Sequence, residues 1–117
     1  VEKLNLFSAS EEIRERLYQR LKKFSLPMVY AEETSLEISP QNVSKATGLQ
    51  KLCEHLGLSI EQTIAVGDSD NDLEILKAAG LSVAMENGKA HIKEICDVIV
   101  ADNNHDGCAE AIEKFLL

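Results

Sequence analysis

The stretch that most constrains the fold is residues 63–72, which read T-I-A-V-G-D-S-D-N-D. It begins with a short apolar run typical of a buried β-strand, continues through Gly67, and then places three aspartates within five residues. The next segment, L-E-I-L-K-A-A-G, has apolar residues at helical spacing and ends in glycine. The aspartates are therefore expected on a turn between a strand and a helix, where open α/β sheets bind their ligands.

Two interpretations of this acidic turn follow from the residues alone. Carboxylates this close repel one another unless a cation lies among them, and a hard divalent cation such as Mg²⁺ prefers oxygen ligands of this kind. Alternatively, Ser69 and Asp70 cap the helix, and Asp72 interacts with the positive end of its dipole. The capping interpretation explains Asp70 better than Asp68, which precedes the cap. Spacing alone leaves both a metal or phosphate site and a capped acidic turn open.

Composition limits the class of protein. The chain has 117 residues, of which 44% are hydrophobic, enough for the core of one modest domain or two small units. A net charge of −8 argues against a nucleic-acid surface, which needs clustered Lys and Arg. No apolar run approaches the roughly 20 residues of a membrane span. The three cysteines show no metal-ligand spacing and lie among apolar neighbours, so we expect buried free thiols and a cytoplasmic protein.

The chain after residue 42 alternates helical and strand patterns, which predicts a parallel sheet with helices on its faces. A helix is expected from residue 43 to Gly57, with Lys45 in its first turn. A cation there opposes the helix dipole, although most such lysines are simply solvated. The expected strands are residues 63–66, 81–84 and 97–100, and the later helices follow residues 72, 89 and 106.

The first part of the chain predicts a smaller unit. An amphipathic helix is expected over residues 10–24, and Pro27 ends it. Two strands, residues 28–31 and 35–38, are joined by a turn at residues 32–34. The polar, proline-containing segment 39–42 is the best candidate for a domain boundary.

Three motifs resemble one known family. They are S-K-A-T-G-L-Q-K-L (residues 44–52), T-I-A-V-G-D-S-D-N-D-L-E-I-L-K-A-A-G-L-S-V-A-M-E-N-G (residues 63–88) and D-V-I-V-A-D-N-N-H-D-G (residues 97–107). Together they resemble the carboxyl-terminal part of haloacid dehalogenase-like (HAD) hydrolases, and most closely the Cof-type (IIB) sugar-phosphate phosphatases. The resemblance implies an α/β fold. It would be a partial HAD-like, Rossmann-like parallel sheet with flanking helices in residues 40–117, preceded in residues 1–39 by a remnant helix and hairpin of the α/β cap domain.

The resemblance also implies roles for individual residues. Asp68 would be a Mg²⁺ ligand, and Asp72 would support the metal, through water. Asn71 would hydrogen-bond the phosphoryl group or order the ligands around the metal. Lys45 would neutralise the charge of the transferred phosphoryl group and of the nucleophile, which accounts for a cation in an unfavourable helix position. Ala46 and Gly88 depart from the residues usual in the family, without touching this chemistry.

One departure from the family is large. Its reaction starts from an aspartate nucleophile in a D-x-D motif on the first core strand, which forms an aspartyl-phosphate. No such motif follows an apolar strand near the start of this sequence, and the Ser/Thr phosphate-binding motif is also missing.

We therefore expect the carboxyl-terminal part of a Mg²⁺-dependent phosphatase acting on a small phosphorylated metabolite. By itself it is expected to be inactive, and prone to self-association through the exposed strand 63–66. The alternative is a short, non-catalytic binding or assembly module that keeps part of the HAD fold.

Overall fold

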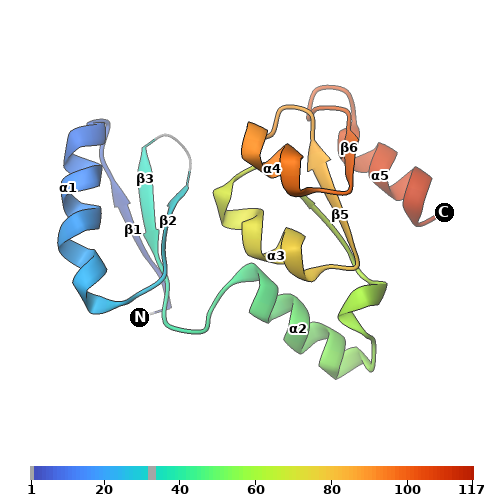
Figure 1. Ribbon diagram of the computed structural model, residues 1–117, viewed down its shortest axis with the longest axis horizontal. Coiled ribbons are helices and arrows are strands. Elements are labelled where there is room, and N and C mark those ends of the chain that lie inside the picture. The colour runs from blue at the N-terminus through green and yellow to red at the C-terminus, as the bar shows by residue number, and fades with distance from the viewer. Residues whose placement is uncertain (1, 32–33) are drawn as a thin grey trace. The chain divides into compact units, whose positions relative to one another are not determined.

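The contacts within the computed structural model, which describes residues 2–31 and 34–117, divide the chain into two compact units, Val1–Ser44 and Lys45–Leu117. Figure 1 shows the elements of both units. The chain is of mixed α/β class, as predicted from the sequence. The turn predicted at residues 32–34 lies mostly outside the described residues.

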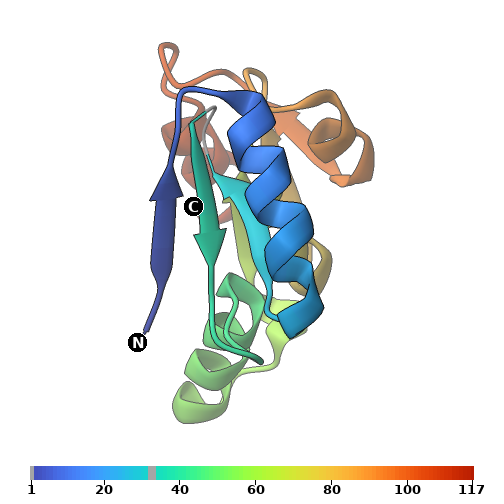
Figure 2. The ribbon, with the colours of Figure 1, turned by 90° about the vertical axis from the view of Figure 1, so that its left-hand side faces the viewer.

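The first unit is a three-stranded antiparallel sheet covered on one face by a helix (Figure 2). Its elements are β1 (Leu4–Phe7), α1 (Glu11–Leu21), a 3₁₀ turn (Lys22–Phe24), β2 (Met28–Ala31) and β3 (Ser35–Ile38). The sheet order is β1-β3-β2, so β3 lies in the middle. Leu36 of β3, opposite Leu6 on one side and Tyr30 on the other, is completely buried. This central strand therefore supplies the core of the unit.

Local sequence signals explain where α1 begins and ends. The Ser10 side chain accepts a hydrogen bond from the Ile13 N–H and caps the first turn. After the 3₁₀ turn, Ser25 adopts a left-handed conformation (φ 52°), and Pro27 follows. Tyr18 of α1 stacks on Tyr30 of β2 with ring centroids 5.6 Å apart, which fixes the helix on the sheet.

The sequence analysis missed one strand of this unit. It predicted a helix followed by a hairpin, whereas β1 adds a third strand that pairs with β3 from Leu4↔Ile38 to Phe7↔Ser35. Four residues of which Leu6 alone is partly buried carry too little periodicity to be recognised. The strand exists because β3 offers it a ladder of hydrogen-bonding partners.

The second unit is a three-stranded parallel sheet with helices on both faces. Its elements are α2 (Lys45–Leu56), a 3₁₀ turn (Ile60–Gln62), β4 (Ile64–Gly67), the 3₁₀ turn η3 (Asp70–Asp72), α3 (Leu73–Ala78), β5 (Leu81–Met85), α4 (Ala90–Ile95), β6 (Val98–Val100) and α5 (Gly107–Phe115). The order β4-β5-β6 follows the sequence, so each crossover joins neighbouring strands. This parallel sheet with flanking helices confirms the predicted fold class.

Helices lie on both sides of this sheet (Figure 1), and a cluster of apolar side chains packs on each face. On one face Ala65, Ala84, Leu76 and Ile92 pack with residues of α3 and α4. On the other face Val83, Met85, Val100 and Ala111 pack, with Ala111 contributed by α5. The alternation along β5 thus sends successive side chains to opposite cores, as a doubly covered parallel strand requires.

Part of the apolar surface predicted to be packed is exposed instead. Helix α2 begins at Lys45, later than expected, and Val43, Leu52 and Leu56 are each more than half exposed. Among the residues of α2, Cys53 alone is buried. On the sheet, Val66 of β4 is 37% exposed although it belongs to a parallel strand. The second unit therefore carries apolar surface that its own described residues leave uncovered.

Candidate functional site

The candidate site lies at the carboxyl ends of the parallel strands. Gly67 ends β4, and the chain then turns through Asp68 and Ser69 into η3. The loop after β5 lies against this turn, because the Lys89 N–H donates to the Asp68 carbonyl over 2.9 Å. A further bond, from the Asn103 N–H to Asn87 Oδ1 (3.2 Å), links the loops after β6 and β5. Three successive loops are thus joined along the edge where α/β sheets bind ligands.

Asp72 is the most buried carboxylate of the turn, and Lys45 reaches it from the start of α2. Lys45 Nζ lies 2.5 Å from Asp72 Oδ1, although 27 residues separate the two in sequence. The Asp72 side chain is 8% exposed, whereas the Lys45 side chain is 52% exposed. The Lys45 side chain therefore contacts a buried carboxylate while remaining accessible to solvent.

The second oxygen of Asp72 holds the backbone of the turn. Asp72 Oδ2 accepts hydrogen bonds from the N–H groups of Asp68 (3.1 Å) and Ser69 (3.3 Å). Burial alone would raise the pKa of Asp72, but the hydrogen bond from Lys45 and the backbone N–H of Asp68 outweigh it and hold that pKa below its usual value. Asp72 is therefore ionised at neutral pH and bonded through both oxygens.

Asp68 and Asn71 present the free polar groups of the turn. Asp68 is exposed, and within the described part of the chain its carboxylate has no hydrogen-bonding partner. Asn71 accepts the Ser69 hydroxyl hydrogen at Oδ1 over 2.7 Å, which assigns its NH₂ group as a donor without a partner among the described residues. An acceptor and a donor thus remain available on the turn that also carries Asp72, the partner of Lys45.

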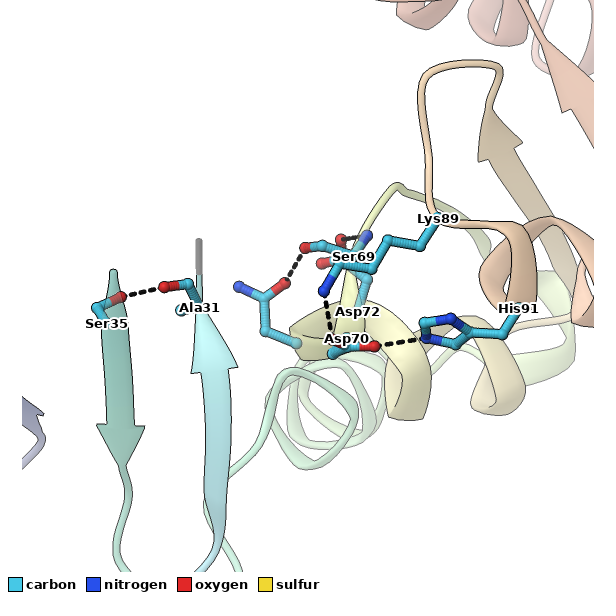
Figure 3. A network of polar contacts seen from close by, with 8 residues as sticks. Ala31, Ser35, Ser69, Asp70, Asp72, Lys89 and His91 are labelled. Carbon is cyan, nitrogen blue, oxygen red and sulfur yellow. Dashed lines mark hydrogen bonds and ion pairs between the residues drawn. The ribbon is translucent and has the colours of Figure 1, made fainter. Parts of the chain in front are cut away.

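A second polar cluster adjoins this turn and was missed by the sequence analysis. Lys89 Nζ contacts Asp70 Oδ2, and His91 Nε2 contacts Asp70 Oδ1, each over 2.5 Å (Figure 3). Hydrogen bonding from Lys89 is the main reason that the pKa of Asp70 lies below its usual value, with His91 acting in the same direction. No local spacing indicates this cluster, because Lys89 and His91 follow Asp70 by 19 and 21 residues.

The donor set can be tested against a hard cation such as Mg²⁺. Asp68 fits, because its carboxylate is exposed and has no competing partner among the described residues. Asp72 fits only a supporting role, because Lys45 and two backbone N–H groups already occupy its oxygens. Residues 2–31 and 34–117 contain no group of three His, Cys, Asp or Glu side chains placed to hold a metal ion. The described residues thus provide one free carboxylate at this turn, and no complete set of protein ligands for a metal ion.

The same described residues include no helix long and apolar enough to cross a lipid bilayer.

The three cysteines differ from the prediction of uniformly buried thiols. Cys53 is buried, Cys96 is intermediate and follows the end of α4, and Cys108 is exposed. None of the three forms a disulfide.

Comparison with known proteins agrees with this geometry. The sequence model of the haloacid dehalogenase-like hydrolases matches residues 1–112. Two curated relatives are the chloroplastic endoribonuclease YBEY of Arabidopsis thaliana and the 5-amino-6-(5-phospho-D-ribitylamino)uracil phosphatase YcsE of Bacillus subtilis. YBEY is 42% identical over 88 residues, which cover 75% of this chain and 15% of YBEY. YcsE is 37% identical over 108 residues, which cover 92% of this chain and 43% of YcsE.

A solved structure gives the same assignment. A haloacid dehalogenase-like hydrolase from B. subtilis matches with a TM-score of 0.91 and 34% identity, over 97% of this chain and 40% of the other. The chain spans less than half the length of each of these three proteins. The match of the family model over nearly all residues confirms the resemblance seen in the three motifs. The chain belongs to the haloacid dehalogenase-like hydrolases.

Proposed function

We propose that this chain is the carboxyl-terminal part of a Mg²⁺-dependent phosphatase that hydrolyses small phosphorylated metabolites, with sugar phosphates as the expected class. The observation that carries the proposal is the contact between Lys45 and buried Asp72, beside the free carboxylate of Asp68. Phosphoryl transfer depends on positioned positive charge where negative charge develops. Membership of the family and the phosphatase activity named for YcsE support the same conclusion.

Each residue has a distinct role in this proposal. Asp68 would hold Mg²⁺ directly, and Asp72 would support it from behind through water. When bound, the metal would neutralise charge on the phosphoryl oxygens. Lys45, fixed by Asp72, would place its ammonium group against the same phosphoryl group. Asn71 would donate its free N–H to a phosphoryl oxygen, with its orientation set by Ser69.

The two units receive different roles. We assign residues 1–39 to the remnant of a cap domain and residues 40–117 to the core domain. In the family the cap selects the substrate, so the leaving group is expected to be recognised outside the Lys45–Asp72 site. The boundary proposed at residue 39 lies just before a turn in which Asn42 adopts a left-handed conformation (φ 61°).

The isolated chain is proposed to be inactive and to self-associate. Inactivity follows because no D-x-D motif follows an apolar strand near the start of the sequence, where the family places its attacking carboxylate; Asp68 and Asp70 have this spacing but belong to the turn after β4. Self-association is supported by β4, which pairs only with β5 among the described residues and exposes Val66. An apolar strand with one unpaired edge recruits another strand. Light scattering at micromolar concentration should give a dimer or larger species, and a monodisperse 12.9 kDa monomer would contradict this.

The experiment for the main proposal uses the intact protein, with residues 1–117 in their natural context. Phosphate release would be measured with Mg²⁺ on a panel of sugar phosphates and an aryl phosphate, for the wild type and for Asp68→Asn. Turnover by the wild type and loss of at least about 100-fold in the variant are expected, because a positioned charge contributes several kcal/mol to such a step. A wild type without turnover on any substrate would favour a non-catalytic module instead.

A further inference from the structure

The cluster of Asp70, Lys89 and His91 is built as a bridge between two loops. Asp70 belongs to the turn after β4, whereas Lys89 and His91 come from the start of α4, after β5. Lys89 binds one carboxylate oxygen and His91 binds the other, as Figure 3 shows. One carboxylate with a separate donor on each oxygen has a defined orientation, which a single exposed ion pair does not provide.

The backbones of the same two loops are also in contact. The Lys89 N–H donates to the Asp68 carbonyl over 2.9 Å. At Gly88 a Cβ atom would lie 3.2 Å from both Asp68 Cα and Asp68 O, and 2.9 Å from Met85 O. The loop after β5 therefore packs directly on the backbone of Asp68, and the Asp70 bridge joins the two loops two residues further on.

The position of the Asp68 side chain depends on these backbone contacts. Its own carboxylate has no hydrogen-bonding partner among the described residues, so only its backbone fixes where the side chain points. That backbone is held at the N–H by Asp72 and at the carbonyl by Lys89. A change in the loop after β5 would reach Asp68 through these contacts.

We propose that Asp70, bridged by Lys89 and His91, is a positioning residue that fixes the turn bearing Asp68 for metal binding and phosphoryl transfer. This inference rests on the function proposed above and deepens it. Asp70 contacts neither metal nor substrate in this account. It acts through Lys89 and the backbone of Asp68. Substitution of residues that support metal ligands typically costs about 10–100-fold in metal affinity or activity.

The effect should appear in function far more than in stability. The side chains of Asp70, Lys89 and His91 are 32%, 49% and 53% exposed, and exposed ion pairs add little to folding because water screens them. A matched pair is available as a control. Lys114 and Glu110 form an ion pair along α5 with side chains 60% and 29% exposed, remote in sequence from the turn.

The test compares Asp70→Asn, Lys89→Met, their combination, Lys89→Arg and the control Lys114→Met in the intact protein. Mn²⁺ binding without substrate would be followed by electron paramagnetic resonance, and kcat, KM and the melting temperature would be measured alongside. We expect Asp70→Asn and Lys89→Met each to weaken Mn²⁺ binding and lower kcat by about 10-fold or more, with KM and melting temperature little changed.

Two further variants identify the bridge as the cause. The double variant should be no worse than Asp70→Asn, because both changes break the same link. Lys89→Arg should retain most of the Mn²⁺ binding and kcat that Lys89→Met loses, because arginine keeps the charge and the donor. Lys114→Met should resemble the wild type.

Three results would overturn the inference. Unchanged Mn²⁺ binding and kcat in Asp70→Asn would reduce the cluster to surface ion pairs, whatever the melting temperature does. A raised KM with unchanged kcat would mean that Lys89 and His91 contact the substrate. A loss in Lys114→Met equal to that in Asp70→Asn would mean that any lost ion pair has the same effect. If the wild type releases no phosphate, the proposed function fails, while Mn²⁺ binding still decides the role of Asp70.

Discussion

Gly67, the last residue of β4, has no room for a side chain, and its replacement by alanine should disturb the site directly. A Cβ atom there would lie 2.6 Å from Asp72 Cβ, 2.9 Å from Asp72 Cγ and 3.0 Å from Asp72 Oδ2. Gly67 does not have a positive φ, so alanine introduces no backbone strain. The effect of Gly67→Ala is therefore the displacement of Asp72.

The size of that displacement sets the expected loss of stability. To reach an ordinary contact of 3.4 Å from 2.6 Å, Asp72 must move by about 0.8 Å. Its hydrogen bonds from the N–H groups of Asp68 and Ser69, already 3.1 and 3.3 Å long, would then weaken or break. Overpacking and the weakened bonds to a charged group together predict about 2–4 kcal/mol of lost stability. A shift of this size at Asp72 should also lower turnover by up to about 100-fold.

Gly48 supplies the matched control. It lies within α2, and a Cβ atom there meets nothing within 4 Å. Because alanine favours a helix interior over glycine, Gly48→Ala should stabilise the protein by about 0.5–1 kcal/mol. Urea unfolding followed by far-ultraviolet circular dichroism measures both changes. If Gly67→Ala were as stable as Gly48→Ala, the close packing of Asp72 on β4 would be wrong.

Two further outcomes follow from the charges of the turn. The pKa of Asp72 is lowered in the folded state, so its stabilising contribution is present above its unfolded pKa of about 4 and is lost as the pH falls through the folded pKa. Below pH 4, the free energy of unfolding should therefore fall more steeply in the wild type than in Asp72→Asn. Equal slopes in the two proteins would contradict this. Calorimetry on residues 1–117 should give weak Mg²⁺ binding, because only Asp68 offers a free carboxylate at the turn; sub-micromolar affinity would indicate a complete site in this chain.

The parts of the fold that could be predicted are those with a local signal. The strands β4 and β5 follow from short apolar runs, and their parallel pairing follows from the helices between them. Strand β6 begins at Val98, one residue later than expected. The reason is that Asp97 turns its carboxylate to the N–H and hydroxyl of Ser82, over 2.9 and 2.7 Å, instead of joining the strand.

The candidate site likewise has one part with a local sequence signal and one part without. The turn of Asp68 and Asp72 could be predicted from ten consecutive residues, 63–72. Lys45 was assigned to the site only through the resemblance to the family. Nothing local indicates that Lys45 meets Asp72, because that contact depends on where α2 packs against α3. Nothing local marks His91 either, because its partner, Asp70, is brought to it only when β4 and β5 pair and their loops meet.

The most direct test of the phosphoryl-transfer site compares two lysines of the same helix. Lys45 contacts Asp72 at the start of α2, whereas Lys51, further along the helix, is exposed and has no partner among the described residues. The measurement is kcat for phosphate release by the intact protein carrying Lys45→Met or Lys51→Met. The account predicts a loss of about 100- to 1,000-fold for Lys45→Met and wild-type turnover for Lys51→Met. Wild-type turnover in Lys45→Met, or equal losses in both variants, would contradict it.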